Sequence, residues 1–276
     1  MASKNLVSVI MSTYNAEEWL EKVITGFAQQ TISNFELVIA DDGSRESTKT
    51  LIDAMRIETG LTIHHIWQED NGFQKCRILN KAIVSSNGDY LIFTDGDCIP
   101  RADFIENHLK FREKGFFLSG GYYKLPLNVS QNITKEDIRK QNCFKLSWLV
   151  KNGLSRSPKN LKLVTRGFLS TFLNSVTPTN ASWNGHNASG WKVDLLAVNG
   201  FDEEMQYGGE DRELGERLFN LGLKSKQIRY NAICIHLDHE RGYVNDAAWK
   251  KNYKIRQNTK ENKVIRTQNG IKSDLS

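Results

Sequence analysis

Strand-length apolar runs alternate with amphipathic stretches over the first hundred residues of the chain. The runs are LVSVIMST (residues 6–13), FELVIA (35–40), LTIHHIW (61–67) and DYLIFTD (89–95). Between them, apolar residues recur three and four positions apart, which is the period of an amphipathic helix. Strands that alternate with helices predict an α/β fold with a mostly parallel sheet that is covered by helices on both faces.

Polar side chains follow each predicted strand at the point where it ends. They are Thr13, Tyr14 and Asn15 after the first strand, Asp41 to Ser44 after the second, Asp70 to Gly72 after the third and Asp95 to Asp97 after the fourth. Ligands of open α/β sheets bind outside the carboxyl ends of the strands. The four polar segments are therefore predicted to converge on one crevice.

The alternation weakens between residues 128 and 180, where we expect an insertion with helical pieces. Within it, residues 160–176 carry basic side chains beside apolar ones at helical spacing; the apolar positions are Leu161, Val164, Phe168, Phe172 and Val176. We interpret this stretch as a helix that faces the core and has a solvated basic edge. Contact of the same helix with a membrane surface is the alternative.

Composition narrows the class of protein. The apolar runs are far too short to cross a bilayer, and the four cysteines lack the CxxC spacing of a zinc ribbon or a disulfide framework. No cleavage-site pattern follows the first apolar run, so we expect a cytoplasmic chain. The net charge of +5 is mild, but bases gather between Lys135 and Arg166. This distribution favours an anionic surface, and we expect no nucleic-acid partner.

Asp95 and Asp97 flank Gly96 at the end of the fourth predicted strand. In an extended segment, side chains two residues apart point to the same side, and a glycine between them lets a ligand approach the backbone. Carboxylate oxygens with open coordination positions suit Mg²⁺ or Mn²⁺ that bridges to a diphosphate. The alternative is a turn that caps the next helix, where Asp is common.

Asp42 lies in the sequence IADDGS, after the second predicted strand. Its carboxylate can accept hydrogen bonds from a nucleobase or a ribose, and Gly43 permits a tight turn beneath it. A turn held by aspartate side chains is an equally good interpretation of this segment on its own.

Glu210 and Asp211 precede a predicted helix that stops at Gly222. Their charges could complement the helix dipole, or one of them could be a general base. Helix-end amides lower the pKa of a carboxylate, so a base at this position requires burial against the substrate. One acid could cap the helix while the other acts as the base.

His236 and His239 stand three residues apart at the end of a further predicted strand. Both can reach one metal ion only if the chain turns after His236. A nitrogen ligand shifts the preference from Mg²⁺ toward Mn²⁺, whereas a zinc site with Cys234 lacks a fourth ligand. Trp191 and Tyr207, near Glu210 in sequence, have rings that suit stacking on a sugar.

Together these segments resemble the metal-dependent nucleotide-sugar glycosyltransferases of the GT-A fold. VSVIMSTYNAEEWLEKVI, FELVIADDGS and NGDYLIFTDGDCIP are similar to successive blocks of glycosyltransferase family 2. Residues 185–239 resemble the half shared by animal galactosyltransferases and chondroitin-type polymerases, where a Trp-Gly-x-Glu-Asp block precedes a strand with a histidine.

The resemblance implies a Rossmann-like GT-A domain with an acceptor-side lobe, in four segments. These are a nucleotide-sugar-binding half (1–121), a basic, partly helical insertion (122–184), an acceptor and catalytic half (185–242) and a basic C-terminal helix that frays into a mobile tail (243–276).

Matched by position, the resemblance implies a role for individual residues. Ser12, Tyr14 and Asp42 would hold the uracil and ribose of a UDP-sugar, and Asp95 would lie near the ribose. The other residues implied to line the site are Thr13, Arg77, Asn187, Trp191 and Tyr207. Asp97 and His239, together with His236, would ligate Mn²⁺ or Mg²⁺. Asp211 would deprotonate the acceptor hydroxyl, Glu210 would position the acceptor, and the anomeric configuration would invert.

The chain departs from the family pattern at several places. Tyr207 stands where the pattern has Trp, and FQKCRILNKAI replaces an Ala-Arg-Asn block, which leaves both Lys75 and Arg77 open as the phosphate contact. The insertion between residues 128 and 180 matches nothing in the family, and we expect it to determine the acceptor.

The implied function is transfer of a sugar from a UDP donor to a hydroxyl of a bacterial surface glycan. Our hypothesis for the acceptor is a glycan on a lipid carrier at the inner face of the membrane. Two other functions compete with this one. A nucleotidyltransferase also uses paired carboxylates on an α/β sheet, and a non-catalytic module would bind the sugar or nucleotide alone.

Overall fold

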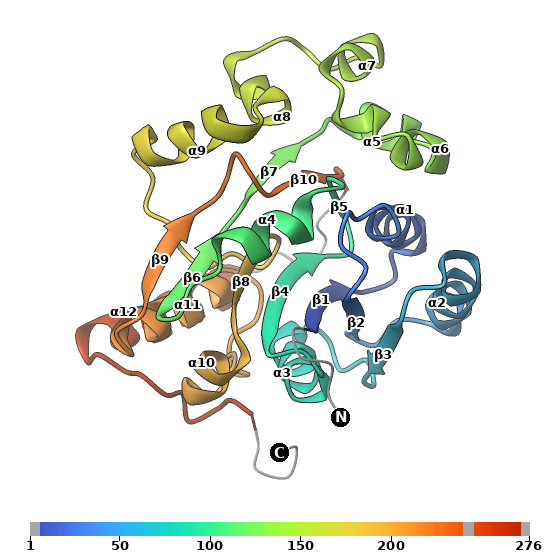
Figure 1. Cartoon of the computed structure of the whole chain (residues 1–276). Coiled ribbons are helices and arrows are strands. Elements are labelled where there is room, and N and C mark those ends of the chain that lie inside the picture. Colours follow the sequence, from blue (N-terminus) through green and yellow to red (C-terminus); the bar gives the residue numbers. More distant parts are fainter. Residues whose placement is uncertain (1–5, 240–245, 272–276) are drawn as a thin grey trace.

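The large sheet is built around four parallel strands, as the sequence predicts. In the computed structural model, which describes residues 6–239 and 246–271, these strands are β1 (Val7–Thr13), β2 (Phe35–Asp41), β3 (Ile63–Trp67) and β4 (Tyr90–Asp95) (Figure 1). β1 pairs with β2 and β4, and β2 pairs with β3, all in parallel. Because parallel strands are covered on both faces, their apolar runs are nearly continuous.

Three helices connect these strands and cover both faces of the sheet: α1 (Glu17–Phe27), α2 (Glu46–Thr59) and α3 (Lys75–Ser85). Alternate side chains of β1 belong to different cores. Val9 and Met11 pack in the core that contains residues of α1 and α2, whereas Ile10 packs in the core that contains residues of α3. The two-residue period of the strand thus produces one apolar layer on each side.

Segments that follow β4 in the chain complete the same sheet. Within the described residues the strand order is β3-β2-β1-β4-β8-β6-β9, with β8 (Ala188–Trp191), β6 (Phe116–Ser119) and β9 (Lys224–Gln227). β8 runs antiparallel to β4 and β6. The helices of this part are α4 (Phe104–Phe111), α10 (Lys192–Ala197) and α11 (Glu210–Asn220). The predicted α/β fold with a mostly parallel sheet is confirmed.

A small second sheet lies beside the end of β4. Its order is β5-β10-β7, with β5 (Cys98–Pro100), β10 (Ile233–His236) and β7 (Gly121–Lys124). β10 pairs antiparallel with β5, and in this register His236 lies opposite Cys98. The small sheet therefore brings a late strand of the chain to the segment that follows Asp95.

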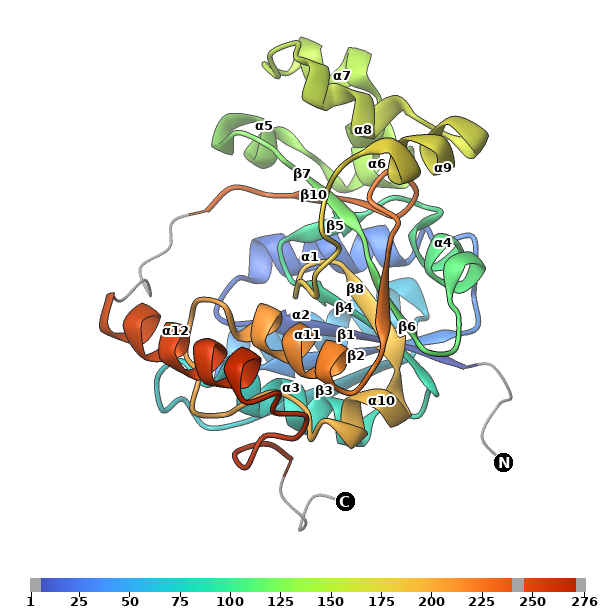
Figure 2. The ribbon, with the colours of Figure 1, turned by 90° about the vertical axis from the view of Figure 1, so that its left-hand side faces the viewer.

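The insertion forms a helical layer over the small sheet, at the top of both views (Figures 1 and 2). Its elements are α5 (Leu127–Asn132), α6 (Lys135–Arg139), η1 (Asn142–Phe144), α7 (Leu146–Lys151), η2 (Pro158–Asn160), α8 (Leu161–Val164) and α9 (Gly167–Val176). The prediction of one core-facing helix over residues 160–176 is wrong. The helix is interrupted at Thr165, and the apolar positions of the predicted core face are 47% to 85% exposed, whereas Ser170 is buried.

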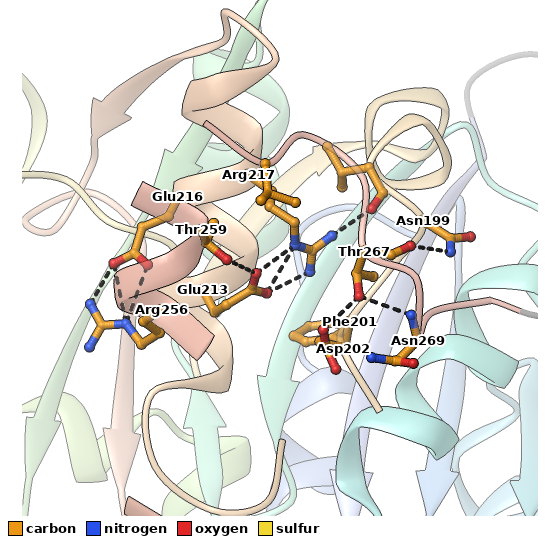
Figure 3. Close-up of polar contacts among 12 residues, drawn as sticks. Asn199, Phe201, Asp202, Glu213, Glu216, Arg217, Arg256, Thr259, Thr267 and Asn269 are labelled. Atoms are coloured by element: carbon orange, nitrogen blue, oxygen red, sulfur yellow. Dashed lines mark hydrogen bonds and ion pairs between the residues drawn. The ribbon is translucent and has the colours of Figure 1, made fainter. Parts of the chain in front are cut away.

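The C-terminal segment is held against α11 by buried polar contacts (Figure 3). The Thr259 hydroxyl of α12 (Asp246–Glu261) donates to Glu213 at 2.9 Å, and Glu213 also forms a buried ion pair with Arg217 at 2.7 Å. Beyond the helix, the Thr267 hydroxyl donates to Asp202 at 2.6 Å. The predicted mobile tail is therefore wrong for residues 262–271.

Three further sequence predictions concern the segment boundaries, the cysteines and membrane-spanning helices. The predicted boundary between residues 242 and 243 lies outside the described residues, and the division into four segments stays a prediction. The four cysteines are free and buried, in agreement with the absence of a disulfide framework. In the described ranges, every helix is too short or too polar to span a bilayer.

Candidate active site

A cavity of about 890 Å³ lies at the carboxyl ends of β1 and β4. Most of the predicted site residues line it: Ser12, Thr13, Tyr14, Asp42, Asp95, Asp97, Tyr207, Glu210, Asp211, His236 and His239. They come from both halves of the chain. The predicted crevice therefore exists, and residues of the second half contribute to its lining.

Asp42 lies at one end of the cavity and is held by two hydrogen bonds. Its carboxylate accepts from the Gln68 side chain at 2.7 Å and from the Gln74 backbone N–H at 2.9 Å. Burial raises the pKa of Asp42 in spite of these bonds. Gly43 beside it has a φ of +96°, and a Cβ there would lie 2.6 Å from the Asp70 Cα. Only glycine permits this approach of the two loops.

Tyr14 and Ser12 extend the same wall from the end of β1. The Tyr14 hydroxyl donates to Asp70 at 2.9 Å, while 49% of the Tyr14 side chain remains exposed to the cavity side and solvent. The Ser12 hydroxyl donates to Asp95 at 2.7 Å. An exposed aromatic ring beside carboxylate acceptors is suited to stack on a nucleobase whose ribose is hydrogen-bonded.

Lys75 lines the cavity from the first turn of α3. Its ammonium lies 2.7 Å from Asp95 Oδ1. Burial alone would lower the pKa of Lys75, but Asp95, Asp211 and Glu210 together raise it well above its usual value. In return, Lys75 holds the pKa of the buried Asp95 carboxyl well below its usual range, against the effect of burial. This lysine is therefore charged and faces three carboxylates.

Asp97 meets the two histidines of the late strand. Its Oδ2 lies 2.8 Å from His239 Nε2 and 3.6 Å from His236 Nε2, although His239 is 142 residues away along the chain. The two imidazole rings are stacked at 6.0 Å with an interplanar angle of 11°. The predicted turn after His236 is thus present and directs both rings toward the same carboxylate.

The residues around Asp97 fit a divalent metal ion. Asp97, Cys98 and His236 offer ligand atoms that all lie within 4.8 Å of one another. The buried Nδ1 of His236 has no hydrogen-bond partner among the described residues. Cys98 Sγ donates to Asp97 Oδ1 at 3.2 Å, which orients the carboxylate. A carboxylate with two imidazoles is a donor set that Mn²⁺ accepts readily.

Glu210 and Asp211 have different surroundings at the start of α11. Glu210 accepts the Gly208 backbone N–H at 2.8 Å and is 6% exposed, so it closes the turn before the helix. Asp211 lines the cavity, and its Oδ1 has no hydrogen-bond partner within the described ranges. Burial, followed by the charge of Glu210, raises the pKa of Asp211 to about 7. A carboxylate with this pKa is suited to act as a general base near neutral pH.

Three of the predicted site residues lie outside the cavity. Asn187 is fully buried and donates from Nδ2 to the carbonyls of Gly121 and Ala232 at 2.8 and 3.1 Å, so it joins the two sheets. Arg77 is exposed on α3. Residues two apart on a helix point in different directions, and Lys75 is the one whose side chain points into the cavity.

Trp191 lies at the opposite end of the sheet. β8 runs antiparallel to β4, so Trp191 pairs with Tyr90, the first residue of β4, whereas Asp95 is the last. Its ring contacts Tyr90 at 5.1 Å and lies under the Lys114 ammonium at 3.6 Å. The predicted contact of Trp191 with the site is therefore wrong, since strand direction carries this end of β8 away from the cavity.

Asn15 and Gly72, which belong to the predicted polar strand ends, also line the cavity. Sequence reasoning missed other lining residues: Ala16, Glu17, Glu18, Trp19, Phe73, Ile78 and His186. His186 packs against Tyr122, with ring centroids 4.4 Å apart, and burial lowers its pKa to about 4, so the ring is neutral. Its position directly after Gly185 is a weak signal, but a backbone close enough to touch Asp211 is visible only in three dimensions.

Helix α12 holds the loop that precedes the two acids. Asn252 is buried, and its Nδ2 donates to the carbonyls of Gln206 and Gly208 at 2.9 and 3.0 Å. The Trp249 ring lies where a Cβ on Gly208 would be, at 2.6 Å. Since this loop leads directly into Glu210, the position of α12 determines where α11 begins.

Replacement of Asn252 by Ala is expected to loosen this loop. One buried and one partly buried carbonyl lose their donor, so the free energy of unfolding should fall by about 1–3 kcal/mol. Because the loop leads into Glu210, kcat should fall more than KM changes. Chemical denaturation and steady-state kinetics measure both effects. Asn258→Ala, an exposed position on the same helix, is the matched control. An equal effect of the two substitutions would contradict the role of Asn252.

The sequence profile of glycosyl transferase family 2 matches residues 8–153, more than half of the chain. The chain belongs to this family. It is 26% identical over 259 residues to an uncharacterized glycosyltransferase, YfnE, of Bacillus subtilis (strain 168), covering 84% of this chain and 64% of that protein. It is 24% identical over 252 residues to a chondroitin synthase of Escherichia coli, covering 83% and 34%. The chain thus spans between a third and two thirds of the length of these relatives.

Solved structures share the fold of this family 2 chain. The Staphylococcus aureus protein TarS, in complex with UDP-GlcNAc, aligns with a TM-score of 0.60 and 17% identity over 90% of this chain and 64% of that one. The mannosyltransferase PcManGT of Pyrobaculum calidifontis, in complex with GDP-Man and Mn²⁺, aligns with a TM-score of 0.57 and 16% identity over 92% and 61%. The predicted GT-A fold is therefore confirmed.

Proposed function

We propose that this family 2 chain transfers a sugar from a UDP-sugar to a hydroxyl group of a glycan acceptor, with inversion at the anomeric carbon. The observation that carries the proposal is the meeting of Asp97, His239 and Asp211 in one cavity. The neighbouring structures with UDP-GlcNAc and with GDP-Man and Mn²⁺ support a nucleotide-sugar donor.

In the proposed reaction, Asp211 accepts the proton of the acceptor hydroxyl. The oxygen forms a bond to the anomeric carbon, the bond from that carbon to the diphosphate breaks, and UDP leaves with the electron pair. A single displacement of this kind inverts the configuration and requires no covalent intermediate on the protein. The Lys75 ammonium, which lies beside Asp95, can stabilise negative charge that develops near this carboxylate.

Asp97, His239 and His236 would hold the divalent ion, either Mn²⁺ or Mg²⁺. A bound ion of this kind supplies Lewis-acid stabilisation to a diphosphate leaving group. The approach of both imidazole Nε2 atoms to the Asp97 carboxylate supports this assignment.

The acceptor is proposed to be a growing bacterial-type surface glycan. Relatives named chondroitin synthase and putative teichuronic acid biosynthesis glycosyltransferase support this class. A lipid carrier would bring such a glycan to the inner face of a membrane. The two rival functions explain less: a nucleotidyltransferase leaves Asp211 and His239 without a role, and a binding module leaves the raised pKa of Asp211 without one.

Calorimetric titration of the protein with UDP, GDP and several UDP-sugars tests the donor and the metal together. We expect UDP and one UDP-sugar to bind in the presence of Mn²⁺. Treatment with EDTA should remove most of this binding. Release of UDP on addition of an oligosaccharide acceptor would establish transfer. Preference for a nucleoside triphosphate with release of pyrophosphate would instead support the nucleotidyltransferase.

A further inference from the structure

Helix α9 turns its apolar side chains away from the protein. Phe168 is 85% exposed, and Leu169, Phe172 and Val176 are each at least half exposed, whereas Ser170 on the same helix is fully buried. A surface helix of a globular protein normally has the reverse arrangement, with the apolar stripe inward. The apolar side of helix α9 is therefore available to contact a partner outside this chain.

The short helix α8, which precedes α9 in the chain, also exposes apolar side chains. Leu161 and Val164 are 48% and 47% exposed. We define the α8–α9 face by its apolar side chains: Leu161, Val164, Phe168, Leu169, Phe172 and Val176. Single exposed apolar residues such as Ile57 are common on soluble proteins, but a contiguous apolar group marks a contact surface.

The segment that carries this face contains basic residues and no acidic ones. Between Asp137 and Asp194 the sequence contains no aspartate or glutamate. Over the same stretch the basic residues are Arg139, Lys140, Lys145, Lys151, Arg156, Lys159, Lys162, Arg166 and Lys192. Lys135 and Arg139, at the start of the insertion, are paired with Glu58 of the main domain, whereas Arg156 and Lys159, next to α8, are exposed.

We propose that the α8–α9 face docks on the surface of a bilayer that contains anionic phospholipid. Phe168, Leu169 and Phe172 enter the boundary between headgroups and acyl chains, and Arg156 and Lys159 contact the lipid phosphates. Apolar side chains beside clustered bases are the combination that holds amphipathic helices at membrane surfaces. The helices lie at one end of the molecule in both views, so they can contact a flat surface (Figures 1 and 2).

Helix α8 contacts a residue that packs against the histidines of the cavity. The Lys162 ammonium of α8 lies 6.0 Å from the Tyr122 ring, and Tyr122 packs against His186 at 4.4 Å and His236 at 5.9 Å. Docking would therefore hold the cavity close to the bilayer surface. The consequence for a lipid-linked acceptor rests on the proposed function; the membrane contact itself does not.

Flotation of the purified protein with vesicles tests the proposal. We expect recovery with vesicles of phosphatidylcholine and phosphatidylglycerol, little recovery with phosphatidylcholine alone, and a decline as salt is raised, because salt screens the charges. The double substitution Phe168→Ser and Phe172→Ser should weaken partitioning on the order of tenfold or more, since two large apolar side chains no longer leave water. Ile57→Ser, an equally exposed apolar position on α2, should have no effect.

A second pair of variants tests the charge. Arg156→Glu with Lys159→Glu should abolish the preference for phosphatidylglycerol, whereas Lys250→Glu with Lys251→Glu, exposed on α12, should retain it. UDP-sugar binding by calorimetry should be unchanged in all four variants, which separates a failure of docking from a failure of the proposed function.

Three results would overturn the proposal. These are equal recovery of the wild-type protein with and without phosphatidylglycerol, an equal effect of the Ile57 substitution, and a dimer in sedimentation experiments that Phe168→Ser dissociates without any vesicle binding. The last result would assign the α8–α9 face to a second copy of the chain.

Discussion

Replacement of Asp211 by Asn is expected to abolish most of the transfer activity while the protein still binds UDP and metal. Asn has nearly the same shape but cannot accept a proton, so kcat should fall by about 10²–10⁴-fold, the usual contribution of a general base. Initial-rate measurements of UDP release, with donor affinity measured by calorimetry, separate the two effects.

The pH dependence of the wild-type enzyme provides a further readout of the same base. Since burial raises the pKa of Asp211 to about 7, kcat/KM should decline below neutral pH as the carboxylate becomes protonated. The decline should approach tenfold per pH unit, and the residual activity of Asp211→Asn should lack this limb. A pH profile that is flat between pH 5 and 8 would contradict the assignment of Asp211 as the base.

The pH dependence of the free energy of unfolding tests whether the Asp211→Asn variant is folded. The pKa of Asp211 rises from 3.8 to about 7 on folding, so the folded state binds more protons between these values and the wild-type protein loses stability as pH rises through this window. Asp211→Asn lacks this loss and should be at least as stable as the wild type above neutral pH. Asp194→Asn, a half-buried acid on α10 outside the cavity, is the matched substitution and should retain activity.

Replacement of Asp97 by Asn is expected to remove metal-dependent donor binding. Asp97 is the carboxylate that both His236 and His239 approach, so the substitution removes the negative charge from the proposed ligand set. Changes in outer-shell partners of metal ligands already cost about 10–100-fold in affinity or activity, and loss of the ligand itself should cost at least as much. Titration with Mn²⁺, in the presence and absence of UDP, measures the loss directly.

The comparison for this substitution is Asp89→Asn, an exposed acid just before β4 and therefore at the other end of the strand. It should bind Mn²⁺ and donor as the wild type does. His239→Ala should reproduce the Asp97→Asn phenotype in part, because one imidazole remains. Mn²⁺ affinity that is unchanged in both Asp97→Asn and His239→Ala would show that the ion, if required, binds elsewhere.

The parallel half of the fold could be predicted from local pattern alone. β1 to β4 are recognisable because each is a short apolar run that both faces of the sheet bury, and the helices between them carry a regular apolar stripe. The polar ends of these strands then had to meet, since parallel strands end at one edge of a sheet. This reasoning reached Tyr14, Asp42 and Asp95 without any knowledge of the rest of the chain.

Prediction failed where side-chain direction depends on strands or helices that are distant in sequence. Trp191 was placed at the site on sequence proximity, yet the antiparallel direction of β8 carries it to the far end of the sheet. Lys75 and Arg77 were equivalent in sequence, and only the rotation of α3 against the sheet decides which one enters the cavity. The apolar spacing of residues 160–176 predicts a helix but not whether its stripe faces the core or the solvent.

The sequence by itself determined the strand-helix alternation, the convergence of polar strand ends and the chemistry of each candidate residue, because these depend on neighbours within a few positions. Tertiary structure alone decided that His239 reaches Asp97 across 142 residues. It also decided that Glu210 closes a turn, while Asp211 lines the cavity with an Oδ1 that has no hydrogen-bond partner among the described residues. The reason is physical: the pKa of a carboxylate and the ligand set of an ion are fixed by distances and burial, and these arise only when segments far apart in the chain pack together.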